Sequence, residues 1–149
     1  MRASRGTASF TLRLSNVCRR VHDCLRGINP DVIVDFMFHD GIFHITVENI
    51  GNSPAYRISV AFDREISGAG AKPINEMALF QDLAFLPPGK RIASFLDSSA
   101  SYFTRGQPTD VNIRVVFHDR WGRKRSNQIR HNLGVYRDLG YAQNRHADT

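Results

Sequence analysis

The residues best suited to binding chemistry gather near the C-terminal end of the sequence. Five cationic side chains surround a tryptophan there, in the set Arg120, Trp121, Arg123, Lys124, Arg125 and Arg130. An indole between guanidinium groups can stack on a nucleobase or hold an anionic surface. The alternative is a solvated edge strand in which Trp121 covers the end of the core. The sequence leaves both interpretations open.

A second basic group lies near the N-terminus, at Arg19 and Arg20. Residues 1 to 26 hold six arginines and one aspartate, and residues 119 to 149 hold seven basic and three acidic side chains. The segment between them is mildly acidic, so the formal net charge of +6 is concentrated at the two ends. Basic ends can attract phosphate or anionic lipid in a salt-sensitive way. Solvated surface is the simpler interpretation.

Two copies of one tripeptide are candidates for a metal site. Phe38-His39-Asp40 and Phe117-His118-Asp119 stand at two expected strand ends, and imidazole with carboxylate suits zinc or manganese if the two turns meet. Aspartate at a turn start is also favoured for its own backbone hydrogen bonds. Both histidines fall on the outward face of their strands. We therefore expect structural turns, no metal and no cofactor.

The sequence offers no convincing catalytic nucleophile. It lacks the G-x-S-x-G elbow of serine hydrolases. Cys18 and His22 are an i, i+4 pair on a predicted helix, where nearby arginines could activate a thiolate. Cys18 also lies on the apolar stripe of that helix, where it would act as a small buried hydrophobe. The sequence therefore predicts a protein that is not an enzyme.

The elements that would position these residues begin with one short amphipathic helix. Ser15 is placed to cap it and Gly27 to end it. Its apolar residues recur at three- and four-residue spacing, at Leu14, Val17, Cys18, Val21 and Leu25. The apolar face could pack on its own domain or on a partner.

A β-hairpin is the firmest structural prediction. Apolar residues alternate with period two on both sides of Asp40-Gly41, a dipeptide typical of two-residue hairpin turns. Such a turn sets a register in which three pairs face each other, namely Phe38 with Phe43, Phe36 with Ile45 and Val34 with Val47. All three pairs are apolar, so the turn chemistry and the hydrophobic pattern agree.

Further strands are expected after segments rich in turn residues. Tyr56, Ile58, Val60 and Phe62 alternate along one, residues 91–97 and 111–117 form two others, and Lys124 to Asn132 is a polar edge strand. Residues 66–73 are interpreted as a flexible crossover, and the type of 74–85 stays open. Residues 98–108 are expected to be loop, with Tyr102 and Phe103 tucked beneath it. The tail offers Tyr136, Leu139 and Tyr141 as docking groups.

Two turn motifs carry a family resemblance. The run Val47-Glu48-Asn49-Ile50-Gly51-Asn52-Ser53-Pro54-Ala55, and later Leu86-Pro87-Pro88-Gly89-Lys90, resembles bacterial immunoglobulin-like domains of the CARDB kind. In those domains a V-x-N-x-G turn precedes one strand and a P-G turn begins a later one. The resemblance covers approximately residues 31 to 133. It implies an adhesion, spacer or docking module and transfers no catalytic residues.

The expected fold is all-β, an immunoglobulin-like antiparallel β-sandwich of about seven strands with a short N-terminal helix. Residues 1–29 would form a basic N-terminal segment, 30–133 the sandwich and 134–149 a C-terminal tail. No apolar run approaches the ~18 residues of a membrane span. Without a recognisable secretory signal, we expect a cytoplasmic or assembly-associated location.

The function expected from these features is a non-enzymatic protein–protein interaction or structural assembly module. Its partners would be other protein chains, as in a multiprotein or virion assembly, and a small-molecule partner is not expected. The alternative is nucleic-acid or anionic-surface binding through the basic ends.

Overall fold

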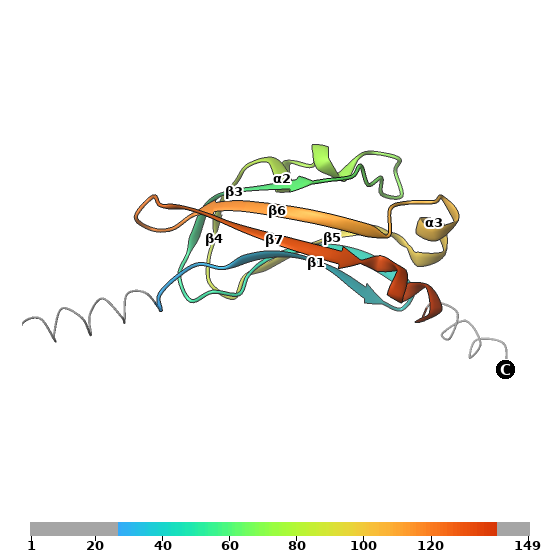
Figure 1. Ribbon diagram of the computed structural model, residues 1–149, viewed down its shortest axis with the longest axis horizontal. Helices are drawn as coiled ribbons and strands as arrows, with labels where there is room; N and C mark the ends of the chain where they lie inside the picture. The colour runs from blue at the N-terminus through green and yellow to red at the C-terminus, as the bar shows by residue number, and fades with distance from the viewer. Residues whose placement is uncertain (1–26, 140–149) are drawn as a thin grey trace, which may run out of the picture.

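The computed structural model describes residues 27–139, which form an all-β body of two antiparallel sheets (Figure 1). The described strands are β1 Val32–His39, β2 Ile42–Asn49, β3 Ala55–Phe62, β4 Leu83–Leu86, β5 Arg91–Ser98, β6 Asp110–His118 and β7 Lys124–Asn132. One sheet has the order β1-β2-β5 and the other β4-β3-β6-β7. Short helical turns lie in the connections, at η1 Ile74–Glu76, α2 Ala78–Gln81, α3 Ser99–Thr104 and η2 Leu133–Tyr136.

The β1–β2 hairpin has the predicted register. Phe38 pairs with Phe43, Phe36 with Ile45, and Val34 with Val47. Asp40 and Gly41 both have positive φ, at 49° and 75°, as a two-residue turn that follows the strand twist requires. The hairpin prediction is confirmed.

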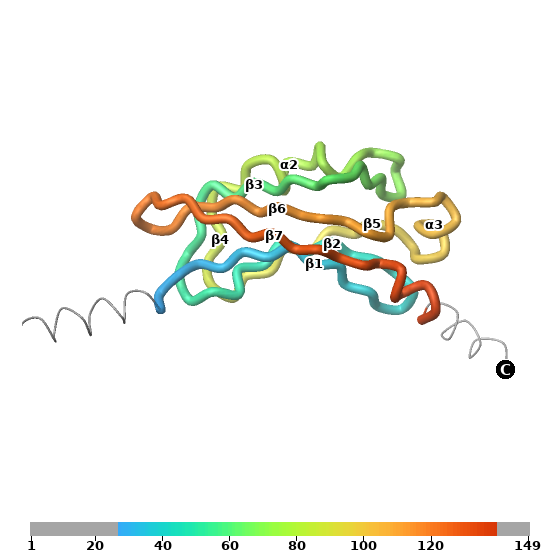
Figure 2. Tube along the Cα trace, in the orientation of Figure 1, coloured from blue at the N-terminus to red at the C-terminus, as the bar shows by residue number. Residues whose placement is uncertain are grey.

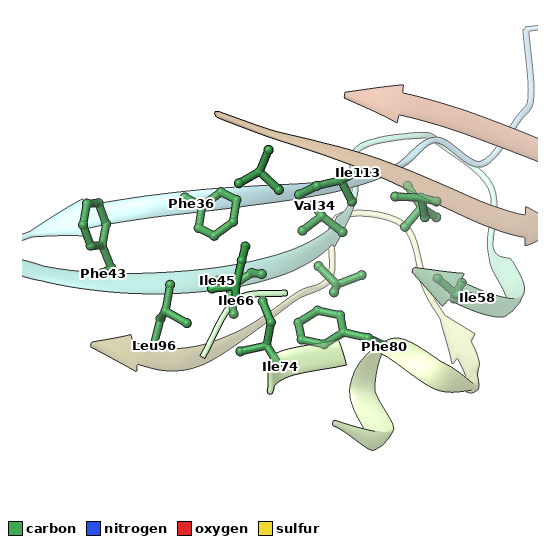
Figure 3. Packing of buried hydrophobic residues seen from close by; sticks show 14 of the residues in the cluster. Val34, Phe36, Phe43, Ile45, Ile58, Ile66, Ile74, Phe80, Leu96 and Ile113 are labelled. Carbon is green, nitrogen blue, oxygen red and sulfur yellow. The ribbon is translucent and has the colours of Figure 1, made fainter. Parts of the chain in front are cut away.

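Apolar side chains of both sheets fill the space between them (Figure 3). Alternate residues of β1 and β6 point inward, which explains the period of two in their sequences. The largest fully buried side chains are Tyr102, Phe36, Phe43, Phe80, Phe117, Ile45, Ile58, Ile66, Leu86, Leu96, Ile113 and Leu133. One continuous core therefore holds the two layers together.

The crossover at residues 66–73 is attached to the rest of the domain at Ile66 and Ala69. Ile66 is fully buried in the core, and its carbonyl accepts a hydrogen bond from the Ile74 amide at 2.9 Å. The Ala69 amide donates to the Leu96 carbonyl of β5 at 2.9 Å. Single apolar anchors without periodicity give no strand or helix signal, which is why the sequence did not reveal these contacts.

Residues 98–108 differ from the expected loop, because α3 forms within them. The Ser98 hydroxyl caps this helix by accepting from the Ser101 amide at 3.2 Å. Tyr102 is buried as predicted, and its hydroxyl donates to the Pro108 carbonyl at 2.6 Å. Burial raises the pKa of Tyr102 to about 12, which keeps this donor protonated.

Strand β3 contains a bulge that interrupts the expected alternation. Tyr56 pairs with His118 and Ser59 with Val116, so β3 has two residues between these pairs where β6 has one. Arg57, at the bulge, has a φ of +49°. Ala55 and Ile58 are both fully buried. The two residues between them, Tyr56 and Arg57, therefore both point away from the core.

Polar side chains of β7 join the two sheets along one side. β1 is an edge strand of its sheet, so the carbonyls on its outer side lack a neighbouring strand. The Asn127 amide donates to the Val32 carbonyl at 2.9 Å, and His131 Nε2 lies 2.9 Å from the Val34 carbonyl oxygen. The predicted polar edge strand is confirmed, and its inward polar residues bond to the backbone of the other sheet.

The end of the described chain packs on the β1–β2 hairpin. The Tyr136 ring centre lies 5.6 Å from those of Phe38 and Phe43, so its docking role is confirmed. Leu139 is 52% exposed, and the expectation that it docks is wrong. Tyr141, the predicted helix, Cys18, His22, Arg19 and Arg20 lie outside the described residues.

Glycine is required at position 51 because two backbone segments meet there. A Cβ atom on Gly51 would lie 2.4 Å from the Asn29 carbonyl oxygen and 2.5 Å from the Asp31 amide nitrogen. The neighbouring chain cannot move away easily, because the Ile50 amide donates to the Asp31 carbonyl at 2.8 Å. The glycine of the V-x-N-x-G turn thus permits a close approach of backbones.

Gly51→Ala should therefore lower the free energy of unfolding by about 3 kcal/mol, since the added methyl group overlaps fixed backbone atoms. Gly70→Ala is the matched control, because a Cβ at Gly70 meets no atom within 4 Å, and it should change stability by less than about 0.5 kcal/mol. Denaturant unfolding measures both. Equal stability of the two variants would contradict the close approach.

Asn127→Ala tests the bonds between the sheets. Val32 is fully buried, so its carbonyl cannot recruit water easily when the amide is removed. We expect a loss of about 2 kcal/mol in the free energy of unfolding. Gln128→Ala changes the next residue on the exposed side of the same strand and should cost less than about 0.5 kcal/mol. Similar losses in both variants would argue against the bonds.

Candidate functional site

The predicted basic strip begins at the turn between β6 and β7. Figure 2 shows this turn at the same end of the molecule as residue 27. The guanidinium carbons of Arg123 and Arg120 lie 5.0 and 5.7 Å from the centre of the Trp121 ring. Trp121 is 48% exposed, so it does not seal the end of the core. Two guanidinium groups therefore lie against the indole within this turn.

A buried carboxylate holds this turn in shape. The Asp119 side chain is fully buried, and its Oδ1 accepts from the amides of Trp121 and Arg123 at 2.9 and 3.0 Å. Its Oδ2 lies 3.1 Å from Arg123 Nε and 3.6 Å from Arg125 Nε. Asp119 therefore serves the turn itself, as the turn interpretation of the His-Asp repeat required.

The environment of Asp119 favours its charged form. Desolvation acts to raise its pKa, but the amide donors of Arg123 and Trp121 and the charges of Arg123 and Arg125 outweigh it. The pKa of Asp119 therefore lies below the ordinary value for aspartate. The carboxylate stays ionised at neutral pH.

The structure separates two members of the predicted strip from the turn. Arg125 faces inward, where its Nη2 donates to Asn29 Oδ1 at 2.6 Å. Arg130 lies six residues beyond Lys124, about 20 Å along the strand. It forms a bidentate salt bridge with Asp110, in which Nε donates to Oδ1 at 2.9 Å and Nη2 to Oδ2 at 2.6 Å. These hydrogen bonds lower the pKa of Asp110 and raise that of Arg130. The strip is therefore not one continuous cationic surface.

The two Phe-His-Asp tripeptides do not meet. The turn between β1 and β2, which contains Asp40, lies at the opposite end of the molecule from the β6–β7 turn (Figure 1). His39 and Asp40 are exposed and lie 3.1 Å apart, whereas Asp119 is buried. Within residues 27–139, no three histidine, cysteine or acidic side chains gather as metal ligands would. The geometry gives no support to a shared metal site.

The outward face of the four-stranded sheet contains a cluster that sequence reasoning missed. Phe85, Tyr56, His118 and Lys124 lie in one row across β4, β3, β6 and β7. The rings of Tyr56 and Phe85 are 5.3 Å apart, and Phe85 is 49% exposed. The β3 bulge adds Arg57 beside them. Only the bulge places Tyr56 outward, and the regular alternation in the sequence concealed it.

The two sheets carry opposite charges on their outward faces. The strands of the four-stranded sheet present Arg57, Arg114, Lys124 and Arg130, with Asp110 as their one outward carboxylate. The other sheet presents Asp35 and Glu48 with Arg91. Linear composition had located the positive charge at the chain ends. Within the described residues, the strands place it on one face.

The outward face of the three-stranded sheet is richer in apolar side chains. Phe95 is 55% exposed and contacts His44, with ring centres 6.2 Å apart. Met37, in register with His44, is half-buried beside them. Arg91 Nε donates to Glu48 Oε2 at 2.8 Å at the margin. An aromatic residue thus stands within an apolar area bordered by an ion pair.

A polar pocket of about 520 Å³ lies where the described chain begins. Its lining includes Asn29, Asp31, Asn52, Arg125 and Asn127. Several of these groups bond to one another, as Asn127 Nδ2 does to Asp31 Oδ1 at 2.6 Å. The pocket continues the polar contact between the sheets and displays no pairing of nucleophile and base.

A family model matches residues 8–137, and its description is Domain of unknown function (DUF8453). The chain belongs to this family. The match includes every strand between residues 27 and 139, and it also takes in the segment that the sequence predicts to be helical. No curated protein matches the chain. Among the described residues of this family member, no helix has the length and apolar character needed to cross a membrane.

Asp119→Asn should weaken the β6–β7 turn in a pH-dependent way. The variant keeps an acceptor for the two amides but loses the charge between Arg123 and Arg125, so we expect a loss of about 2 kcal/mol in stability at pH 7. Because the folded pKa is lowered, this contribution is present above the unfolded pKa of about 4 and is lost as pH falls through the folded value.

Chemical unfolding of wild type and variant between neutral and acid pH measures this difference. It should narrow steadily below about pH 4. Asp40→Asn, at the exposed turn of the other hairpin, is the control and should leave stability nearly unchanged. A difference for Asp119→Asn that is independent of pH would show that its charge contributes nothing.

Proposed function

We propose that this domain is a non-enzymatic protein–protein interaction or structural assembly module built on an immunoglobulin-like β-sandwich. The strand order supports the fold proposal. If β1 to β7 are lettered A, B, C, C′, E, F and G, the two sheets have the strand orders A-B-E and C′-C-F-G. This arrangement is typical of immunoglobulin-like domains whose fourth strand joins the second sheet. The turns that resemble CARDB domains lie in contact, since the Gly89 amide donates to the Asn49 carbonyl at 2.8 Å.

The exposure of Phe95 carries the functional proposal. Phe95 is 55% exposed beside the bulge at which β5 changes register with β2. A ring so exposed lacks the stability that burial in its own core would give, and a partner that covers it recovers that free energy. Met37 extends the apolar area beside it, the His44 ring contacts it, and the Arg91–Glu48 pair lies at the border. An apolar centre with a charged margin is the usual composition of a protein interface.

The partner is a protein chain that presents an apolar residue to Phe95. Aromatic residues at the centre of an interface contribute a large share of the binding free energy. The ionisable groups at the margin already pair with each other, as Arg91 does with Glu48 at 2.7 Å. They therefore orient the partner on the surface and contribute less to the affinity than Phe95 does. A cytoplasmic or assembly-associated location remains a proposal of the same kind.

Phe95→Asp tests this surface. The full chain is used to capture binding proteins from its native source, each captured protein is purified, and its affinity is measured by titration calorimetry. We expect at least a tenfold loss of affinity with Phe95→Asp, because a charge would replace an anchoring ring. Phe85→Asp is the matched control, since Phe85 is similarly exposed on the opposite sheet, and it should bind as wild type does. If every captured protein binds Phe95→Asp normally, the proposed surface is wrong.

A further inference from the structure

The outward face of the four-stranded sheet carries a second site, independent of Phe95. We propose that this face binds single-stranded nucleic acid. Tyr56 and Phe85 stack on bases, and Arg57, Arg114 and Lys124 contact phosphates. This inference goes beyond the proposed function, because it assigns a different ligand to the opposite face of the molecule.

The aromatic part of the site is built by the β3 bulge. Tyr56 and Phe85 are direct neighbours across β3 and β4, with ring centres 5.3 Å apart. Both point outward, and Phe85 is 49% exposed. Tyr56 is half-buried. Adjacent rings on an outward face offer successive stacking surfaces, and every base has a face that can stack on them. Bulges commonly redirect side chains at binding sites.

The cations on the same face as these rings are free to meet phosphates. Arg57, Arg114 and Lys124 are exposed. Within the described residues, no carboxylate lies within ion-pair distance of any of the three. Arg130, by contrast, is already held by Asp110 on the same face. An unneutralised positive face attracts a polyanion over several ångströms.

The size of the site suits a short stretch of single strand. The row from Phe85 to Lys124 crosses four strands, or about 14 Å at the usual strand spacing. Along β6, His118 and Arg114 are four residues apart, or about 13 Å. Serine and glutamine side chains lie between the cations on β7, at Ser126 and Gln128, and can hydrogen-bond to base edges.

A single strand explains both parts of the surface. An acidic peptide or an anionic membrane would use the cations but does not present an aromatic base at every repeat of its anionic chain, as a nucleic acid does. Stacking on an open antiparallel sheet is a known mode of single-strand recognition. The strained φ of +49° at Arg57 is consistent with a site, because the same bulge exposes both a ring and a cation.

Fluorescence anisotropy with labelled DNA and RNA of about 12 nucleotides, at low and rising salt, tests this proposal on the full chain. Tyr56→Ala and Phe85→Ala should each weaken binding about tenfold and leave the salt dependence unchanged. Lys124→Ala should reduce the slope of log affinity against log salt by about one phosphate contact. Tyr56→Phe keeps the ring and should bind as wild type does. Circular dichroism confirms that each variant is folded.

Arg91→Ala and Phe95→Ala are the matched controls on the other sheet, and neither should change nucleic-acid affinity. Absence of binding at low salt overturns the proposal. Binding that is insensitive to Tyr56→Ala and Phe85→Ala also overturns it, as does equal affinity for polyglutamate or for vesicles rich in anionic lipid. Because Phe95 is not used here, these results leave the proposed protein interface untouched.

Discussion

The buried side-chain amide of Asn49 holds together the end of the molecule at which three chain segments meet, at Asp31, residues 49–53 and Leu86. Its Nδ2 donates to the carbonyls of Ser53 and Leu86 at 2.8 and 3.0 Å, and its Oδ1 accepts from the amides of Gly51 and Asp31 at 3.0 and 3.2 Å. Two donors and two acceptor positions are all that an asparagine amide has. A buried group with every position used fixes its neighbours, because breaking any bond leaves a polar atom unsatisfied in the core.

This network explains why two distant turn motifs occur in one chain. The backbone N–H of Asn49 donates to the Lys90 carbonyl at 3.1 Å, which brings the P-P-G-K turn against the V-x-N-x-G turn. Leu86, which accepts from the Asn49 side chain, ends β4 in the other sheet. Asn49 thus sets where β1 begins, where β2 ends and how β4 passes to β5. The contacts proposed for either face depend on this end, because it fixes how the sheets lie against each other.

Features that depend on neighbours in sequence could be predicted, and features that depend on distant contacts could not. The Asp40-Gly41 turn specifies its own register, so Phe36 and Ile45 were paired correctly. The Arg57 bulge arises from how β3 pairs with β6, and no local pattern shows it. The bonds from β7 to β1 join residues almost 100 positions apart. In the sequence these inward polar residues looked like a strand exposed on both sides.

The same distinction governs the candidate sites. The positions of the cations in the sequence predicted a strip from Arg120 to Arg130. Alternation within β7 instead turns Arg125 inward and Lys124 outward, and Arg130 forms an ion pair with Asp110. Strand pairing then gathers Arg57, Arg114 and Lys124, which are far apart in sequence, on one face, whereas Phe95 and the Arg91–Glu48 pair lie on the other. A rigid two-layer body with unlike faces can contact two different partners at once without either contact blocking the other. We propose that such a body bridges two partners, since two flat surfaces can bind without any convergence of reactive groups.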